Sequence, residues 1–404
     1  MHTPGRFLKS LLRGRRASPP RDFPLNGFKL VDGKERLEEE NWEWYSPEVF
    51  YPVRLGEIFC TRYQVLGKLG YGAHSTAWLC RDLEAHRYVT LKVCEQNSPS
   101  TAREAAAYEH LRSLRTSHSG ALLIRQLLDA FKIKGVSGDH MCFVHEPLGM
   151  SLETFRQLMP GNRLPKDLVK AVSKHLLLAL DCLHTEAGMI HTDLQARNVH
   201  LRIEDETMLK EFESRERSDP SLRKVDGQRI IYESRGFMLP SKMGRPILCD
   251  FGEARYGPPP FVDDIQPYIY RAPEVILDIP WGVQTDVWNL GVLIWDLLEG
   301  RPLFTARGED GEQLIKFHLA EMIALMGPPP INVLQRTQTS LSYFDSRGSW
   351  KASAAIPQIS LEASENVLSP GDKIAFLKFL RRMLTWAPED RASARQLLDD
   401  SWLK

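Results

Sequence analysis

The feature that most constrains this chain of 404 residues is the segment His191-Thr192-Asp193-Leu194-Gln195-Ala196-Arg197-Asn198. It lies between an apolar, helix-like run and the short apolar run 199–201. An acid with an amide five residues further on, in a loop, suits a phosphoryl-transfer site. Asp193 would accept or orient the proton of an attacking hydroxyl, and Asn198 would hold Mg²⁺ against nucleotide phosphates. The alternative is an ordinary polar loop with an Asp turn, so the interpretation depends on partner motifs elsewhere.

Such partner motifs occur in a fixed order around this segment. Asp250 follows the apolar run 246–249, at the end of an expected strand, where it would bridge Mg²⁺ to the phosphates. The motifs are Gly70-Tyr71-Gly72-Ala73-His74-Ser75, Val89-Thr90-Leu91-Lys92, Asp250-Phe251-Gly252 and Ala272-Pro273-Glu274. Together with the loop at 191–198, they resemble the signature set of the eukaryotic protein kinase family.

The N-terminal part of the match resembles one branch of that family, the SR-protein kinases. This branch of Ser/Thr kinases is related to the cyclin-dependent and MAP kinase groups. The segments that carry the resemblance are 51–59, 62–65, 68–72 and 75–79. Ser75 stands in place of the usual third glycine, a substitution that recurs in this branch. The glycines would let backbone N–H groups approach the phosphates closely.

The resemblance implies roles for further residues. Lys92 would contact the α- and β-phosphates and pair with an acid on the helix expected over 102–114. We choose Glu104 over Glu109, because Tyr108 and Leu111 then share its helix face. Backbone groups of Glu146 and Leu148 would bind the adenine edge. The expected ATP-binding set is Leu69, Gly70, Tyr71, Gly72, Ala73, His74, Ser75, Thr76, Ala77, Lys92, Glu146 and Leu148.

The resemblance implies an α+β, bilobal protein-kinase-like fold with a β-rich N-lobe, about 55–146, and a mainly helical C-lobe, about 147–404. A leucine-rich helix is expected over 165–185. Asn198 and Asp250 are 52 positions apart, which indicates an insertion at about 203–245. We expect this insertion to be partly ordered and packed on the C-lobe. Asp286 would hold the catalytic loop, and Arg391 would pair with Glu274.

Composition agrees with a globular protein, because 43% of the residues are hydrophobic. The formal net charge is zero, which gives no reason to expect nucleic acid or a membrane as partner. The six cysteines form no Cys-x-x-Cys pair and indicate reduced thiols in an intracellular compartment. No apolar run approaches the roughly 18 residues of a membrane span. We expect a monomer, located in cytoplasm and nucleus.

The N-terminus differs from the rest in composition. Residues 1–47 are expected to form a basic, disordered tail that precedes a kinase domain over 48–404. Residues 1–21 contain six Arg or Lys and no acid, so a mitochondrial transit peptide is an alternative. The acidic cluster Glu38-Glu39-Glu40 marks the expected transition to packed structure, and its charges are expected to form a solvated face.

The function expected from these motifs is ATP- and Mg²⁺-dependent phosphorylation of Ser or Thr in protein substrates. A pseudokinase scaffold and a small-molecule phosphotransferase are the alternatives. Gln195 stands where most Ser/Thr kinases have a lysine, and we expect Arg197 to replace that charge. Thr192 stands where many kinases have an arginine that binds a phosphorylated activation loop. The loop from Phe251 to Pro273 also contains no Ser or Thr, so we expect activity without phosphorylation there.

The protein substrate is not specified by these motifs. In the SR-protein kinases, an acidic groove guides arginine-rich substrates. The helix that corresponds here is 315–327, and the two acids of the groove fall at Phe317 and Ala324. Processive phosphorylation of Arg-Ser repeats is therefore not expected.

Overall fold

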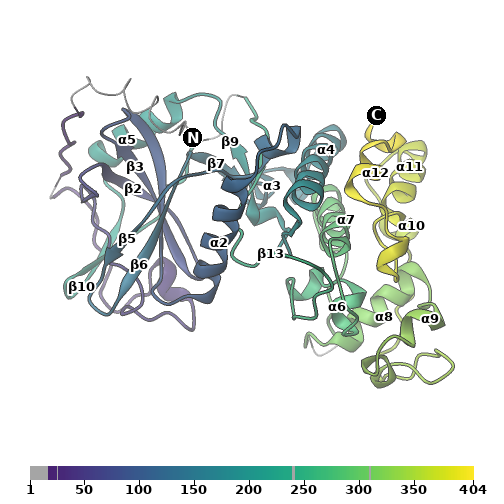
Figure 1. Ribbon diagram of the computed structural model, residues 1–404. Coiled ribbons are helices and arrows are strands. Elements are labelled where there is room, and N and C mark those ends of the chain that lie inside the picture. The colour runs from purple at the N-terminus through teal and green to yellow at the C-terminus, as the bar shows by residue number, and fades with distance from the viewer. Residues whose placement is uncertain (1–16, 25, 239–241, 309–310) are drawn as a thin grey trace, which may run out of the picture. The chain divides into compact units, whose positions relative to one another are not determined.

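The computed structural model describes residues 17–24, 26–238, 242–308 and 311–404. The chain divides into two compact units (Figure 1). Unit 1 contains the chain up to residue 102, residues 126–149 and residues 203–243. Unit 2 contains residues 103–125, 150–202 and 244–404. Unit 1 is built on a β-sheet and unit 2 is mainly helical, which confirms the α+β fold class.

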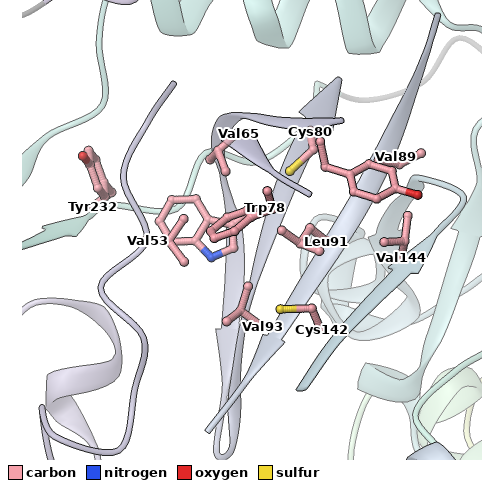
Figure 2. Packing of buried hydrophobic residues seen from close by; sticks show 12 residues of the cluster. Val53, Val65, Trp78, Cys80, Val89, Leu91, Val93, Cys142, Val144 and Tyr232 are labelled. Atoms are coloured by element: carbon pink, nitrogen blue, oxygen red, sulfur yellow. The ribbon is translucent and has the colours of Figure 1, made fainter. Parts of the chain in front are cut away.

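Unit 1 contains a six-stranded antiparallel sheet in the order β1-β2-β3-β4-β6-β5. The strands are β1 (Ile58–Phe59), β2 (Tyr63–Gly72), β3 (Ser75–Asp82), β4 (Arg87–Cys94), β5 (Leu127–Lys134) and β6 (Asp139–His145). Successive side chains of a strand point to opposite faces. One face buries a cluster that includes Val65, Trp78, Leu91 and Val144, with Tyr232 from the insertion 5.7 Å from the Trp78 ring (Figure 2).

The insertion belongs to unit 1, so the expectation that it packs on the C-lobe was wrong. Its elements are α5 (Thr207–Ser218), β10 (Arg223–Asp226) and β11 (Arg229–Tyr232). Leu209 and Phe212, one helical turn apart on α5, pack against Leu66 and Leu79 of the sheet. A Cβ at Gly67 would lie 2.6 Å from Phe212 Cε1, so this glycine is required for the close approach of α5. The second face of β2 and β3 is also apolar, and α5 covers it.

The segment before residue 48 is also part of unit 1. From Ala17 onward it is described except for Leu25, and it makes specific contacts, in contrast to the expected disordered tail. Glu39 is buried against Lys68, and Glu40 accepts hydrogen bonds from Lys224 at 2.8 and 3.0 Å. The acidic cluster is therefore not a solvated face, because lysines distant in sequence neutralise it. Residues 1–16, and with them most of the candidate transit peptide, lie outside the described residues.

Unit 2 is organised around two long helices, α4 (Lys166–Cys182) and α7 (Gln284–Glu299) (Figure 1). The expected helix at 165–185 is thus confirmed. The other helices are most of α2 (Pro99–Ser113), α3 (Leu152–Gln157), α6 (Pro273–Ile276), α8 (Ile315–Met326), α9 (Ile331–Leu334), α10 (Leu361–Ser364), α11 (Pro370–Arg381) and α12 (Ala394–Leu398). All side chains from Thr285 to Glu299 are buried. Such a helix is a rigid support for neighbouring loops.

Short strands and buried polar contacts complete unit 2. Its strands are β7 (Leu148–Ser151), which enters from unit 1, β8 (Met189–Ile190), β9 (Val199–Arg202), β12 (Pro246–Leu248) and β13 (Arg255–Tyr256). Arg391 donates two hydrogen bonds to Glu274, at 2.7 and 3.0 Å, which confirms the expected pair. All six cysteines are free thiols and five are buried. Within the described residues, no helix is long and apolar enough to span a membrane.

Candidate functional site

The catalytic-loop candidate lies between β8 and β9 in unit 2, and Asp286 of α7 holds its backbone. The two carboxylate oxygens of Asp286 accept the N–H groups of His191 and Thr192, each at 2.8 Å. His184 Nε2 donates to the same carboxylate at 2.9 Å. Thr192 has a φ of 66°, which a β-branched residue rarely adopts. Such strain persists only where surrounding contacts over-determine it, and here the buried Asp286 supplies them.

Both carboxylate oxygens of Asp193 are held by amide side chains. Asn198 Nδ2 donates to Asp193 Oδ2 at 2.6 Å and to the Asp193 carbonyl at 2.9 Å. Gln195 Nε2 donates to Oδ1 at 2.5 Å. Burial raises the pKa of Asp193, and the negative charge of Asp250 raises it further. Both acids that the sequence singled out lie in unit 2.

The pairing of β9 with β12 brings Asn198 and Asp250 together. Leu248 is opposite Val199 in this ladder, and the Cys249 N–H donates to the Asn198 carbonyl at 2.8 Å. His191 Nε2 donates to the Cys249 carbonyl at 3.0 Å. Because the amide nitrogen of Asn198 faces Asp193, its side-chain oxygen is the atom left for a cation.

These oxygen donors fit Mg²⁺. The described residues contain no cluster of three His, Cys, Asp or Glu that would hold a metal by itself. Mg²⁺ is usually bound by one or two carboxylates together with substrate phosphates and water. Asn198 and Asp250 thus match an ion that arrives with a nucleotide rather than one held in a protein cage.

Helix α2 contacts the segment that follows Asp250. Tyr108 packs edge-on against Phe251, with ring centroids 5.5 Å apart. Arg103 donates to the Gly252 carbonyl at 2.8 Å and pairs with Glu253 at 2.5 Å. Glu104 is buried and Glu109 is exposed, so Glu104 is the acid on the packed face of α2. Sequence reasoning did not find Arg103, because a helix arginine carries no signal that distinguishes it from a solvated one.

The remaining predicted residues lie in unit 1. Strands β2 and β3 form a hairpin in which Gly70 is opposite Ala77 and Gly72 is opposite Ser75, so Ala73 and His74 form the turn. The hairpin also contains Leu69, Tyr71 and Thr76. Lys92 on β4 lies between Ala77 of β3 and Phe143 of β6. Glu146 follows β6 directly, and Leu148 begins β7.

The geometry changes the interpretation of Arg197. Its side chain is exposed, and its Nε donates to Gln195 Oε1 at 2.7 Å. Gln195 in turn donates to Asp193, so Arg197 acts on the acid through Gln195. From the sequence, Arg197 was expected to replace a missing charge, and the contact between Gln195 and Asp193 was not expected. The sequence feature that could have indicated this contact is the position of Gln195 two residues after Asp193, because a side-chain amide can form a local hydrogen bond.

The segment between Asp250 and Glu274 is held by contacts that need no phosphate. Arg255 pairs with Asp263 at 2.9 Å, and β13 pairs with β8. Phe261 and Trp281 exchange backbone hydrogen bonds of 3.0 and 2.9 Å. Thr192 Oγ1 donates to the Glu253 carbonyl at 2.6 Å. The side chain at the position usually occupied by an arginine thus contacts the segment directly.

A separate open cavity of about 630 Å³ occurs in unit 1, lined by residues that include Arg81, Lys210 and Arg217. It contains none of the predicted site residues. The assignment of the site therefore depends on the motif geometry and not on this cavity.

Comparisons with known proteins agree with this geometry. The protein kinase domain model matches residues 63–224 and 235–403. A serine/threonine protein kinase of Aspergillus fumigatus is 46% identical over 391 residues, which cover 96% of this chain and 95% of the relative. A serine/threonine-protein kinase SRPK of Physarum polycephalum is 32% identical and covers 91% of each chain. A solved kinase domain, PF14_0431, has a TM-score of 0.68 at 24% identity and covers 88% of this chain and 99% of its own; it supports the fold. The chain belongs to the protein kinase family and is a serine/threonine protein kinase related to the SRPK kinases.

Proposed function

We propose that this kinase transfers the γ-phosphoryl group of ATP to Ser or Thr side chains of proteins, with Asp193 as the base. The observation that carries the proposal is the contact network around Asp193. Its carboxylate is fixed by Asn198 and Gln195, and Asp250 follows Cys249, whose N–H donates to the Asn198 carbonyl. A fixed acid beside two oxygen donors for a cation is the arrangement that phosphoryl transfer requires.

The other predicted residues receive roles from this proposal. Asn198 and Asp250 would hold Mg²⁺, which neutralises phosphate charge when bound. The backbone of the glycine-containing hairpin would cradle the phosphates. Lys92, supported by Glu104, would bind the α- and β-phosphates, and the backbones of Glu146 and Leu148 would bind adenine. Most of the rate acceleration would come from positioning and charge neutralisation.

A transfer assay separates this proposal from its alternatives. Radiolabelled ATP is incubated with the protein, Mg²⁺ and a panel of basic and Ser/Arg-rich peptides, with small hydroxyl compounds such as choline in parallel. We expect label on peptide Ser or Thr, which phosphoamino-acid analysis identifies. Nucleotide binding without transfer would indicate a pseudokinase, and label only on the small compounds would indicate a small-molecule phosphotransferase. Asp193→Asn serves as the negative control.

Arg197→Ala is expected to lower kcat by at least roughly tenfold, equivalent to about 1.4 kcal/mol of transition-state stabilisation. The substitution removes the cation that holds Gln195, and Gln195 holds the base. Steady-state kinetics with saturating ATP measures the effect. Gln195→Ala is the companion variant. An unchanged kcat for Arg197→Ala, with a lowered kcat for Gln195→Ala, would contradict a role for the charge.

The kinase is expected to need no phosphorylation between Asp250 and Glu274. Arg255 already pairs with a carboxylate, Asp263, and Thr192 contacts the segment without a charge. Protein made in bacteria, shown by mass spectrometry to be unmodified there, should have a kcat within about twofold of protein from its native host. Strong activation by phosphorylation of a tyrosine in this segment would disprove the expectation.

Long Arg-Ser repeats are expected to bind weakly. On α8, Phe317 and Ala324 occupy the positions where the resemblance places acids, and the Lys316 ammonium lies 5.0 Å from the Phe317 ring centroid. Glu321, the acid between these two positions on α8, accepts hydrogen bonds from Thr305 and Ala306, so its carboxylate is already engaged. Fluorescence anisotropy with an Arg-Ser repeat peptide measures binding. The double variant Phe317→Asp/Ala324→Glu should gain salt-sensitive affinity. Strong, salt-sensitive binding by the unmodified protein would be inconsistent with this expectation.

A further inference from the structure

The strand that leads into the glycine-containing hairpin has a fully buried lysine. Lys68, two residues before Gly70 on β2, has a side chain that is 0% exposed. Its ammonium group contacts the Glu39 carboxylate, lies 3.6 Å from Glu38 Oε2 and donates to the Tyr232 carbonyl at 3.0 Å. A buried charge is tolerated only where it is paired and hydrogen-bonded. The position of Lys68 therefore depends on the segment before residue 48.

The same segment reaches the hairpin itself. Trp42 packs edge-on against Tyr71, which stands between the two glycines, with ring centroids 6.4 Å apart and an interplanar angle of 69°. Trp44 stacks on Trp42 at 5.0 Å. The Lys68 ammonium lies 5.3 Å from the Tyr71 ring centroid. The Tyr71 ring thus contacts both Trp42 and the buried Lys68.

The insertion also contacts Lys68 and the N-terminal segment, through two backbone N–H groups. The Arg235 N–H donates to the Lys68 carbonyl at 2.9 Å. The Ser234 N–H donates to Glu38 Oε1 at 3.1 Å. Lys68 is therefore fixed through its side chain by Glu39 and through its backbone by the insertion. These two segments are far apart in the sequence, and they meet at this one strand.

We propose that Glu39, Lys68, Trp42 and Tyr71 form a clamp that fixes the conformation of the glycine-containing hairpin and so raises nucleotide affinity. Glu39 and Trp42 are positioning residues, because they act through Lys68 and Tyr71. A loop that is ordered before binding loses less conformational freedom when it binds a ligand. The nucleotide part of this inference rests on the proposed function, whereas the ordering of the hairpin does not.

The test compares two acids of one cluster. Glu39→Gln removes the nearer of the two negative charges beside Lys68, while Glu40→Gln removes the charge paired with Lys224 on β10, a strand of a separate two-stranded sheet. Hydrogen–deuterium exchange of residues 66–78 and the Kd for Mg²⁺-ATP are measured for both. We expect Glu39→Gln to speed exchange in the hairpin and to raise the Kd and the KM for ATP about tenfold at unchanged kcat. Glu40→Gln should change neither, even if it lowers the Tm equally.

Trp42 provides a second variant, at a partly exposed position whose loss the fold tolerates better. Trp42→Ala should reproduce the faster exchange and weaker ATP binding, and Trp42→Phe should restore both. Equal exchange and equal Kd in the Glu39, Trp42 and Glu40 variants would overturn the clamp. If the unmodified protein bound no nucleotide, the proposed function would fail, while the exchange measurements would still decide whether the hairpin is clamped.

Discussion

Replacing Asp193 by Asn is expected to reduce kcat by at least about 10³-fold, equivalent to about 4 kcal/mol of transition-state stabilisation. An amide cannot accept the proton of the attacking hydroxyl, and removal of a general base alone costs roughly 10²- to 10⁴-fold. The hydrogen bonds add to the loss. Asn198 and Gln195 each donate to one carboxylate oxygen of Asp193. An Asn at this position has a single acceptor oxygen, so one donor would face an NH₂ group.

The Asp193→Asn measurement needs a control for folding and for nucleotide binding. The Kd for ATP should remain close to that of the unmodified protein, because neither adenine nor the phosphates contact this side chain in the proposed mechanism. The donor left without an acceptor lowers the Tm, so the kinetics are measured well below the Tm of the variant. Single-turnover kinetics with radiolabelled ATP then isolates the chemical step. A kcat reduced by less than about tenfold would show that Asp193 is not the base.

Much of the site could be predicted because its information is local. Asp193 and Asn198 lie in one short loop, and Asp250 follows a strand that pairs with the strand after that loop. Glu104 could be distinguished from Glu109 because helical spacing alone decides which of them shares a face with Tyr108. The same holds for the expected helix around α4, where apolar periodicity marks the buried face.

What could not be predicted depends on contacts between distant segments. The insertion contains an amphipathic helix, but periodicity does not say which surface its apolar face will cover. The position of the helix depends on the close approach of Phe212 to Gly67. A glycine in a strand does not indicate which residue will pack against it. The acidic cluster is a similar case. Glu39 pairs with Lys68 and Glu40 pairs with Lys224. A run of acids that was expected to face solvent therefore connects the N-terminal segment to the sheet and to the insertion.

Removal of one partner from the buried pair of Glu274 and Arg391 is expected to give the largest loss of stability. Both side chains are 0% exposed. Glu274→Ala would leave the Arg391 guanidinium buried without a counter-charge, which typically costs 3–5 kcal/mol. The Gln284 and Thr385 carbonyls, at 2.8 and 2.9 Å, would still accept hydrogen bonds from Arg391, but they carry no full charge. Urea unfolding followed by tryptophan fluorescence measures the change in the free energy of unfolding.

A double variant distinguishes the loss of the pair from the loss of packing around it. In Glu274→Leu/Arg391→Met both charges are replaced by apolar groups, so no buried ion remains without a partner. Replacement of a whole buried pair is often close to neutral, whereas the removal of one member is not. The double variant should therefore unfold at a higher urea concentration than either Glu274→Ala or Arg391→Ala. If all three variants lost equal stability, the cost would come from packing against Trp288, whose ring centroid lies 5.3 Å from the guanidinium carbon.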